Sequence, residues 1–191
     1  MMRKNAISCL GLLSLLLFCA PITSAQNIAV SADGPYRIPS SIRTIRDLSS
    51  HLSMMTPAVV ARIVDGDTIV VSFDRVTGLG GSEKVRLIGV DTPETVDPRR
   101  PVERFGKEAA RFARERLLGR RVRLAFESRL RDHYGRLLAY VFLPDGGCFN
   151  LQIVAEGFGF AYTKYPFMFM ADFREAERSA RTARRGLWGP D

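Results

Sequence analysis

The chain has 191 residues, of which 46% are hydrophobic and 25% are charged. This length favours one compact domain plus a tail or targeting segment, and this balance allows a buried core without disulfides. The formal net charge is +8, so the folded protein should attract polyanions. The sequence contains no internal repeat and no low-complexity tract, which excludes a repeat architecture.

The first 25 residues have the organisation of a secretory signal peptide. Arg3 and Lys4 precede an apolar run over residues 6–21, and small residues follow up to Ala25, after which we expect cleavage. The alternative is a membrane anchor, but the run is shorter than the roughly 20 apolar residues of a span. We therefore expect a secreted or periplasmic protein with no stable membrane span after cleavage, and we take it to be a monomer.

Signal cleavage would leave a single cysteine. Cys9 and Cys19 are removed with residues 1–25, so Cys148 cannot form an internal disulfide. We interpret Cys148 as a small hydrophobic residue near a turn rather than as a nucleophile. The mature domain must then be held together by its hydrophobic core.

Residues 26–57 have a low density of apolar side chains and contain the turn signals Asp33-Gly34-Pro35 and Pro39-Ser40-Ser41. We interpret this segment as a flexible or loosely docked leader. Residues 42–52 could form one or two helical turns. The domain itself is expected over residues 58–188.

The first half of the domain is predicted to be a three-stranded meander. β-Branched runs over residues 59–64 and 68–73 flank Asp65-Gly66-Asp67, a tight-turn signature, and residues 84–90 form the third strand.

After the meander, apolar residues between 102 and 118 fall on one helical face, and Gly119 offers a stop. Asn150 is a good N-cap for a further helix. The remaining elements are expected as strands over 122–126 and 137–143 and as helices over 151–156 and 171–183. This order favours an α+β fold, a five-stranded OB-fold β-barrel with three α-helices, which is a frame often used to bind nucleic acids.

Three polar clusters lie at the ends of the predicted strands. They are Asp65-Gly66-Asp67-Thr68, Arg86 with Asp91-Thr92-Pro93-Glu94, and Asp132-His133-Tyr134-Gly135-Arg136. Asp-Gly alone is a common hairpin turn. An arginine within an apolar strand, however, needs an anionic partner, because burying it unpaired is unfavourable.

Together these clusters resemble the staphylococcal nuclease family. The matching strings are Val64-Asp65-Gly66-Asp67-Thr68, Arg86 with Asp91-Thr92-Pro93-Glu94-Thr95, Tyr134-Gly135-Arg136 with Leu138-Ala139-Tyr140, and Gly186-Leu187-Trp188. The resemblance covers about residues 58–188. It implies an OB barrel with three helices and a Ca²⁺-dependent endonuclease that hydrolyses DNA, RNA or both and leaves 3′-phosphate ends.

The resemblance also implies residue roles. Asp67 and Asp91 match the two calcium-ligating carboxylates, and Thr92 matches the residue that adds a backbone carbonyl. Such oxygen ligands suit Ca²⁺, a hard cation.

Three further positions match the family's catalytic residues. Arg86 and Arg136 match the pair that grips the reacting phosphate, and Glu94 matches the carboxylate that orients or deprotonates the attacking water. Guanidinium groups stay charged at any working pH and bind phosphate oxygens in a bidentate way, which suits this role.

Two tyrosines are candidates for substrate binding. Tyr134 matches a family residue that contacts the substrate's terminal phosphate, and Tyr162 matches one that packs against a nucleotide. The alternative is a half-buried tyrosine at a barrel edge. His133 stands where the best-known member of the family has a lysine. The apolar stretch 167–170 replaces a polar loop, and we interpret it as core or pocket wall rather than as a partner surface.

The alternative function is a non-catalytic OB-fold module that binds nucleic acid. Such relatives lose the arginine pair, the glutamate or the metal carboxylates, whereas all five of these side chains are present here. Arg99 and Arg100 precede the first long helix and are placed to meet flanking phosphates.

Overall fold

The computed structural model describes residues 34–73, 78–94 and 104–190. The predicted signal peptide, Arg99 and Arg100 lie outside these residues. No helix within the described ranges is long and apolar enough to cross a membrane.

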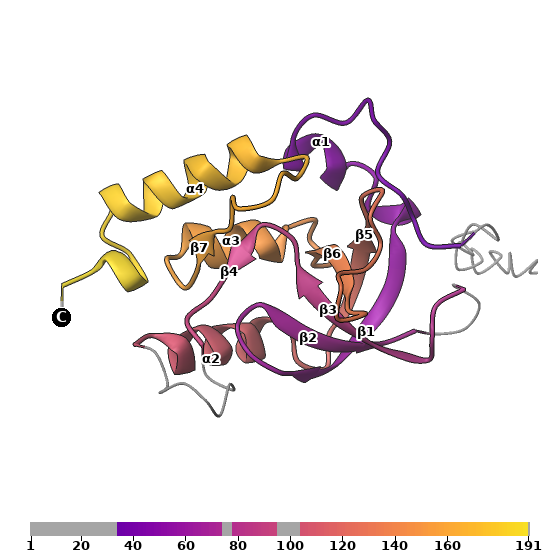
Figure 1. Cartoon of the computed structure of the whole chain (residues 1–191), viewed down its shortest axis with the longest axis horizontal. Coiled ribbons are helices and arrows are strands. Elements are labelled where there is room, and N and C mark those ends of the chain that lie inside the picture. The colour runs from indigo at the N-terminus through magenta and orange to yellow at the C-terminus, as the bar shows by residue number, and fades with distance from the viewer. Residues whose placement is uncertain (1–33, 74–77, 95–103, 191) are drawn as a thin grey trace, which may run out of the picture.

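The predicted five-stranded barrel is confirmed, and it closes in the order β1-β2-β3-β6-β5 (Figure 1). The strands are β1 (Thr56–Ile63), β2 (Thr68–Ser72), β3 (Ser82–Leu87), β5 (Arg121–Ala125) and β6 (Leu137–Phe142). Neighbouring strands are antiparallel except β3 and β6, which run parallel. Fully buried aliphatic side chains on alternate positions, such as Ile69, Val71, Val85 and Leu87, fill the interior.

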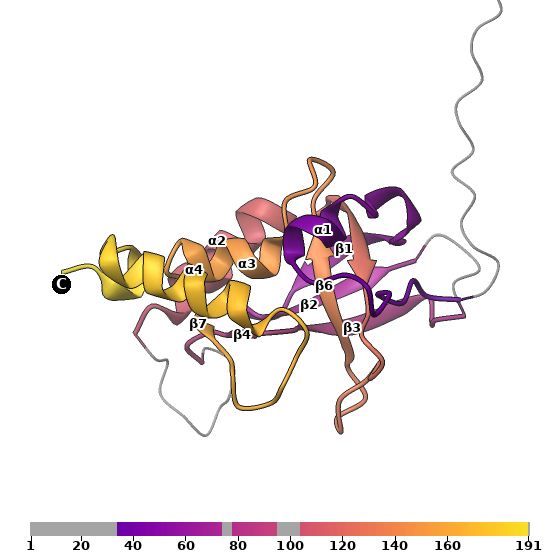
Figure 2. The ribbon, with the colours of Figure 1, turned by 90° about the horizontal axis from the view of Figure 1, so that it is seen from above.

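The three predicted helices are confirmed, and they gather at one end of the barrel (Figure 1). They are α2 (Gly106–Leu117), α3 (Phe149–Ala155) and α4 (Met170–Thr182). Short turns add α1 (Ile45–Ser49), η1 (Leu52–Met54) and η2 (Gly186–Trp188). The view from above shows α4 and α3 packed side by side next to the barrel (Figure 2).

The third predicted strand is in fact two strands. The chain turns at Ile88 and Gly89, so that β3 ends at Leu87 and a separate two-stranded sheet forms from β4 (Val90–Asp91) and β7 (Phe160–Ala161). Gly89 has φ +76°, and a Cβ there would lie 2.9 Å from the rings of Phe167 and Phe173. Glycine therefore allows both the turn and the close packing of these rings.

The described part of the predicted leader, residues 34–57, packs against the domain over much of its length. Ile42, Ile45, Leu48 and Met55 are buried in the common core, and β1 begins at Thr56, inside the segment assigned to the leader. Residues 36–38 also pair with Phe126 after β5. The apolar residues were too widely spaced to indicate a packed element, but tertiary contacts bury them.

Asn150 does not cap α3, contrary to the sequence-based expectation. Cys148 occupies the N-cap position, and Asn150 lies inside the helix with no exposed surface. Its side-chain oxygen accepts a hydrogen bond from Val141 N at 2.8 Å, and its amide donates to Ile88 O and Ala139 O at 3.0 Å each. Asn150 thus fixes the turn after β3 against β6.

Cys148 is buried, as expected of a small hydrophobic residue. Burial raises the pKa of its thiol to about 12, so the thiolate nucleophile is absent at neutral pH.

Replacing Asn150 by alanine should lower the free energy of unfolding by about 2–4 kcal/mol, because buried Val141 N–H and Ile88 C=O groups lose their partners. Urea denaturation measures this loss. Gln152→Ala, on the same helix but only half-buried, is the matched control and should change stability far less. Equal losses in the two variants would show that the Asn150 amide contributes nothing specific.

Candidate active site

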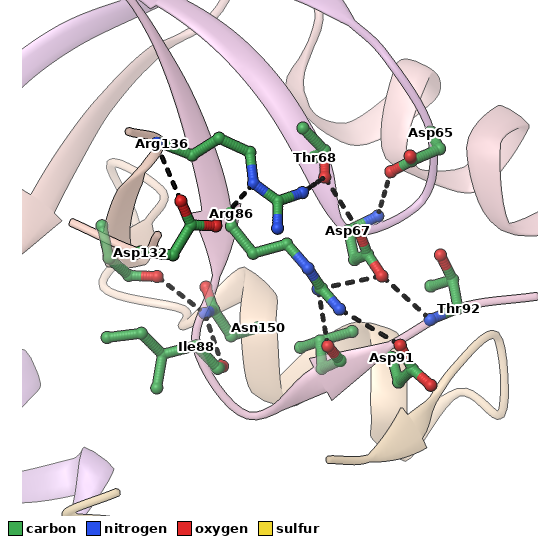
Figure 3. A network of polar contacts seen from close by, with 12 residues as sticks. Asp65, Asp67, Thr68, Arg86, Ile88, Asp91, Thr92, Asp132, Arg136 and Asn150 are labelled. Carbon is green, nitrogen blue, oxygen red and sulfur yellow. Dashed lines mark hydrogen bonds and ion pairs between the residues drawn. The ribbon is translucent and has the colours of Figure 1, made fainter. Parts of the chain in front are cut away.

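A cavity of about 210 Å³ opens where the ends of β2, β3, β4 and β6 meet. It is lined by Asp65, Asp67, Thr68, Arg86, Asp91, Thr92, Pro93, Glu94 and Arg136. All the residues predicted as catalytic or metal-binding from the sequence are therefore brought into one cavity. Figure 3 shows most of them converging from separate strands and turns.

Arg86 is the central side chain of this cavity. It lies on β3 opposite Thr68 of β2, which brings it beside Asp67. Its Nη1 lies 2.9 Å from Asp67 Oδ2 and donates to Val90 O at 2.6 Å, and its Nη2 lies 3.1 Å from Asp91 Oδ1. The side chain is 15% exposed. The anionic partner expected for an arginine in this strand is thus confirmed, and there are two.

Asp67 is buried and held at both carboxylate oxygens. Oδ2 accepts a hydrogen bond from Thr92 N at 3.1 Å, and Oδ1 accepts one from Thr68 Oγ1 at 2.9 Å. The preceding Gly66 is required for this arrangement, since a Cβ there would lie 2.7 Å from Thr92 Cγ2 and 2.9 Å from Ala109 Cβ. The turn between β1 and β2 therefore packs against the loop after β4 and against α2.

Asp65 is a fourth carboxylate in the cavity, beside Asp67, Asp91 and Glu94, and no role was predicted for it from the sequence. Its Oδ1 accepts a hydrogen bond from Asp67 N at 3.1 Å. Burial, followed by the negative charge of Asp67, raises the pKa of Asp65 to about 7. The cavity therefore has a surplus of negative charge around Arg86, and this surplus would favour a bound cation.

The donor atoms available suit a hard cation. Asp67 and Asp91 offer carboxylate oxygens, and the main chain of Thr92 lies next to both. Across the described residues, no three His, Cys, Asp or Glu side chains already surround one point as a metal cluster. A Ca²⁺ ion here would thus take oxygen ligands from two carboxylates and complete its shell with backbone, water or substrate oxygens.

Arg136 approaches the cavity from the loop before β6 and is held by Asp132. Its Nε donates to Asp132 Oδ2 at 2.7 Å, and its backbone N donates to Asp132 Oδ1 at 3.0 Å. Burial acts to raise the pKa of Asp132, but the hydrogen bonds and charge of Arg136 outweigh it, and the pKa is lowered. Nη1 of Arg136 reaches Thr68 Oγ1 at 3.4 Å. No role was predicted for Asp132 from the sequence, although its place in the same turn, four residues before Arg136, could have indicated this orienting contact.

The two candidate tyrosines stand beside the two arginines rather than in the cavity lining. Tyr162 follows β7 and donates its N–H to Gly89 O at 2.9 Å, and its ring centroid lies 5.9 Å from Arg86 Cζ. The Tyr134 ring lies 5.5 Å from Arg136 Cζ and is 74% exposed. The pairing of β4 with β7, which sequence periodicity missed, is what brings Tyr162 to Arg86.

Removing the Arg86 side chain should lower the free energy of unfolding by about 3 kcal/mol, because buried Asp67 then loses its cationic partner. Equilibrium denaturation of Arg86→Ala measures this change. The double variant Arg86→Ala/Asp67→Asn should recover part of the loss, since no charge is left buried unpaired. Strictly additive losses would contradict coupling of the two side chains.

Comparison with known proteins identifies the family. A sequence profile for the staphylococcal nuclease homologues matches residues 84–190. A thermonuclease of Staphylococcus intermedius is 37% identical over 164 residues, which cover 83% of this chain and 86% of that protein. A thermonuclease of Staphylococcus hyicus is 38% identical over 130 residues, or 68% of this chain and 73% of that protein. Endonuclease YncB of Bacillus subtilis is 32% identical over 143 residues, which cover 73% of this chain and 65% of that protein. The profile match, these relatives and the closed five-stranded barrel show that the chain belongs to the staphylococcal nuclease family.

Proposed function

We propose that this protein is a secreted nuclease that hydrolyses phosphodiester bonds of DNA, RNA or both, requires Ca²⁺ and leaves 3′-phosphate ends. One observation carries the proposal: Arg86, Arg136 and Glu94 line the same small cavity as the carboxylates Asp67 and Asp91. The relatives named thermonuclease and endonuclease support the same reaction.

Binding of the reacting phosphate falls to the two arginines. Attack on a phosphodiester adds negative charge to a group that already carries one, and preorganised guanidinium donors stabilise that charge. Arg86 is positioned by Asp67, Asp91 and Val90 O, whereas Arg136 is positioned by Asp132. Both donors are thus oriented before substrate arrives, which lowers the reorganisation needed in the transition state.

Asp67, Asp91 and the backbone carbonyl of Thr92 would hold the metal. When bound, Ca²⁺ supplies positive charge to the phosphate and can orient water. Asp67 is fixed by Thr68 Oγ1 and Thr92 N, so its carboxylate is presented in a single orientation.

Glu94 orients or deprotonates the attacking water. The water oxygen forms a bond to phosphorus while the bond from phosphorus to the 5′ oxygen breaks, and the phosphate stays on the 3′ oxygen. The proton of the water passes toward the Glu94 carboxylate, and the leaving 5′ oxygen takes up a proton from solvent.

Export follows from the predicted signal peptide over residues 1–25. Release after Ala25 would place the mature chain in a periplasm or outside the cell, where it would act as a monomer on free nucleic acid.

The purified protein should cleave single-stranded DNA with Ca²⁺ and stop when a chelator is added. Glu94→Gln should lower kcat by about 10²–10⁴-fold, because the neutral amide cannot accept a proton. A gel assay of product length against time, with end-group analysis, gives both results. A folded protein that binds the strand but does not cut it with Ca²⁺ would instead favour the non-catalytic OB-fold module.

Asp132→Asn should lower kcat/KM by about 10- to 100-fold, because the amide keeps the turn but cannot hold Arg136 Nε with a charged acceptor. Asp145→Asn is the matched control, since Asp145 caps a comparable turn through Gly147 N at 2.9 Å and is not among the residues lining the cavity. Equal activity of the two variants would remove Asp132 from the positioning of Arg136.

A further inference from the structure

The turn that carries Arg136 is tied to the barrel by a second arginine, Arg131. Arg131 lies in the loop between β5 and β6, which projects from the barrel (Figure 2). Its Nη2 donates to Glu83 Oε1 at 2.7 Å, and its Nη1 donates to Glu83 Oε2 at 3.0 Å. Glu83 lies on β3, 48 residues earlier in the chain. A bidentate pair therefore joins this loop to the strand that also carries Arg86.

The Glu83 end of this pair is held in place. Its side chain is 16% exposed, and Oε1 also accepts a hydrogen bond from Gly80 N at 3.2 Å. The hydrogen bonds from Arg131 keep the pKa of Glu83 below its usual value, so the carboxylate stays ionised at neutral pH. Arg131 itself is 38% exposed, and an ion pair so open to solvent adds little to stability. Stability alone therefore does not account for a pair of this geometry.

Arg131 makes a third contact, directly before the cavity arginine. Its Nη1 also donates to Gly135 O at 2.7 Å. The peptide group between Gly135 and Arg136 is held at its other side as well, because Arg136 N donates to Asp132 Oδ1 at 3.0 Å. A peptide group is planar, so hydrogen bonds at both its C=O and its N–H fix its orientation. Asp132 also holds Arg136 Nε at 2.7 Å (Figure 3), so these contacts together set the direction of the Arg136 side chain.

Resting on the proposed function, we propose that Arg131 and Glu83 are positioning residues for Arg136. Glu83 orients the Arg131 guanidinium, and Arg131 in turn fixes the carbonyl of Gly135, so that Arg136 is directed at the reacting phosphate. Neither Arg131 nor Glu83 is among the residues that line the cavity. Their effect is carried by a backbone carbonyl, and it is largest where charge develops in the transition state, because a misdirected donor then stabilises that charge less well.

Reversing the charges separates this role from a merely structural one. In the double variant Glu83→Arg/Arg131→Glu, the ion pair between β3 and the loop can form again. A carboxylate has no hydrogen-bond donor, however, so it cannot replace the contact with Gly135 O. The double variant should therefore recover the stability lost in either single variant without recovering kcat.

The test compares Arg131→Gln, Glu83→Gln and the charge-reversed double variant. Glu177→Gln is the matched control, since the Glu177 side chain is 19% exposed and pairs with Arg181 at 3.2 Å on α4. KM and kcat are measured with Ca²⁺ on a single-stranded oligonucleotide, and stability is measured by urea denaturation. Solvent exchange of the Arg136 Nε–H is followed by ¹⁵N NMR in chelator, which reports the hold on Arg136 without any cleavage.

We expect Arg131→Gln to lower kcat by about 10- to 100-fold, since a small misplacement of a catalytic group costs a factor of this order. Glu83→Gln should lower kcat by about 3- to 30-fold, because the amide keeps one acceptor oxygen for the guanidinium. KM should stay within about twofold in both variants, as should all values for the control. Exchange of the Arg136 Nε–H should speed up by about 2- to 10-fold in Arg131→Gln.

The proposal also requires that Arg131 act through Arg136. In an Arg136→Ala background, Arg131→Gln should lower kcat by less than about twofold, because no guanidinium is left to direct. An equal loss with and without the Arg136 side chain would overturn the proposal, as would a wild-type kcat in the charge-reversed variant. Unchanged Nε–H exchange in Arg131→Gln would overturn it as well. If the wild-type protein does not cleave with Ca²⁺, the proposed function fails, and the exchange rates still decide whether Arg131 orients Arg136.

Discussion

The ion pair between Arg86 and Asp67 is the constraint on which the site is built. It places a guanidinium in the barrel wall with 15% of its side chain exposed, beside a carboxylate that is 9% exposed. A charge in that position is tolerated only when it is paired and its remaining protons are satisfied. Val90 O and Asp91 Oδ1 provide those acceptors, so the pair also fixes β4 and the loop that follows it. Fold stability and site geometry therefore depend on the same contacts.

Asn150 provides the second link between core and cavity. Its amide joins the turn at Ile88 to β6, and that turn is where the chain leaves β3 and enters β4. Without this turn, the chain from Arg86 to Asp91 would form one continuous strand. Val90 O could then not accept the hydrogen bond from the Arg86 guanidinium. Asn150 therefore influences the site indirectly, through the backbone groups to which its buried amide is hydrogen-bonded.

Much of this arrangement could be predicted from local sequence, and the failures have a common cause. Strand alternation gave the five barrel strands, and the need of Arg86 for an anionic partner indicated a carboxylate nearby. The two-residue strands β4 and β7 were missed because such short pairings have no period to detect. The packed part of the N-terminal segment and the interior role of Asn150 were missed for a related reason. These two features depend on burial or on contacts with residues more than 60 positions away, and local composition reveals neither. Ile45 N, for example, donates a hydrogen bond to Asp172 on α4.

The contacts that hold Arg86 also limit how it can act. A guanidinium that is held by Asp67, Asp91 and Val90 O can give more of its donors to a phosphate when its carboxylate partners gain another source of positive charge. Four carboxylates and only two arginines line the cavity, so positive charge is in deficit there in the protein alone. On the proposed function, a cation held by Asp67 and Asp91 would remove the deficit and weaken their hold on Arg86. Metal binding and phosphate binding would then favour each other through Arg86. The same arginine can therefore stabilise the fold as part of an ion pair and bind the reacting phosphate.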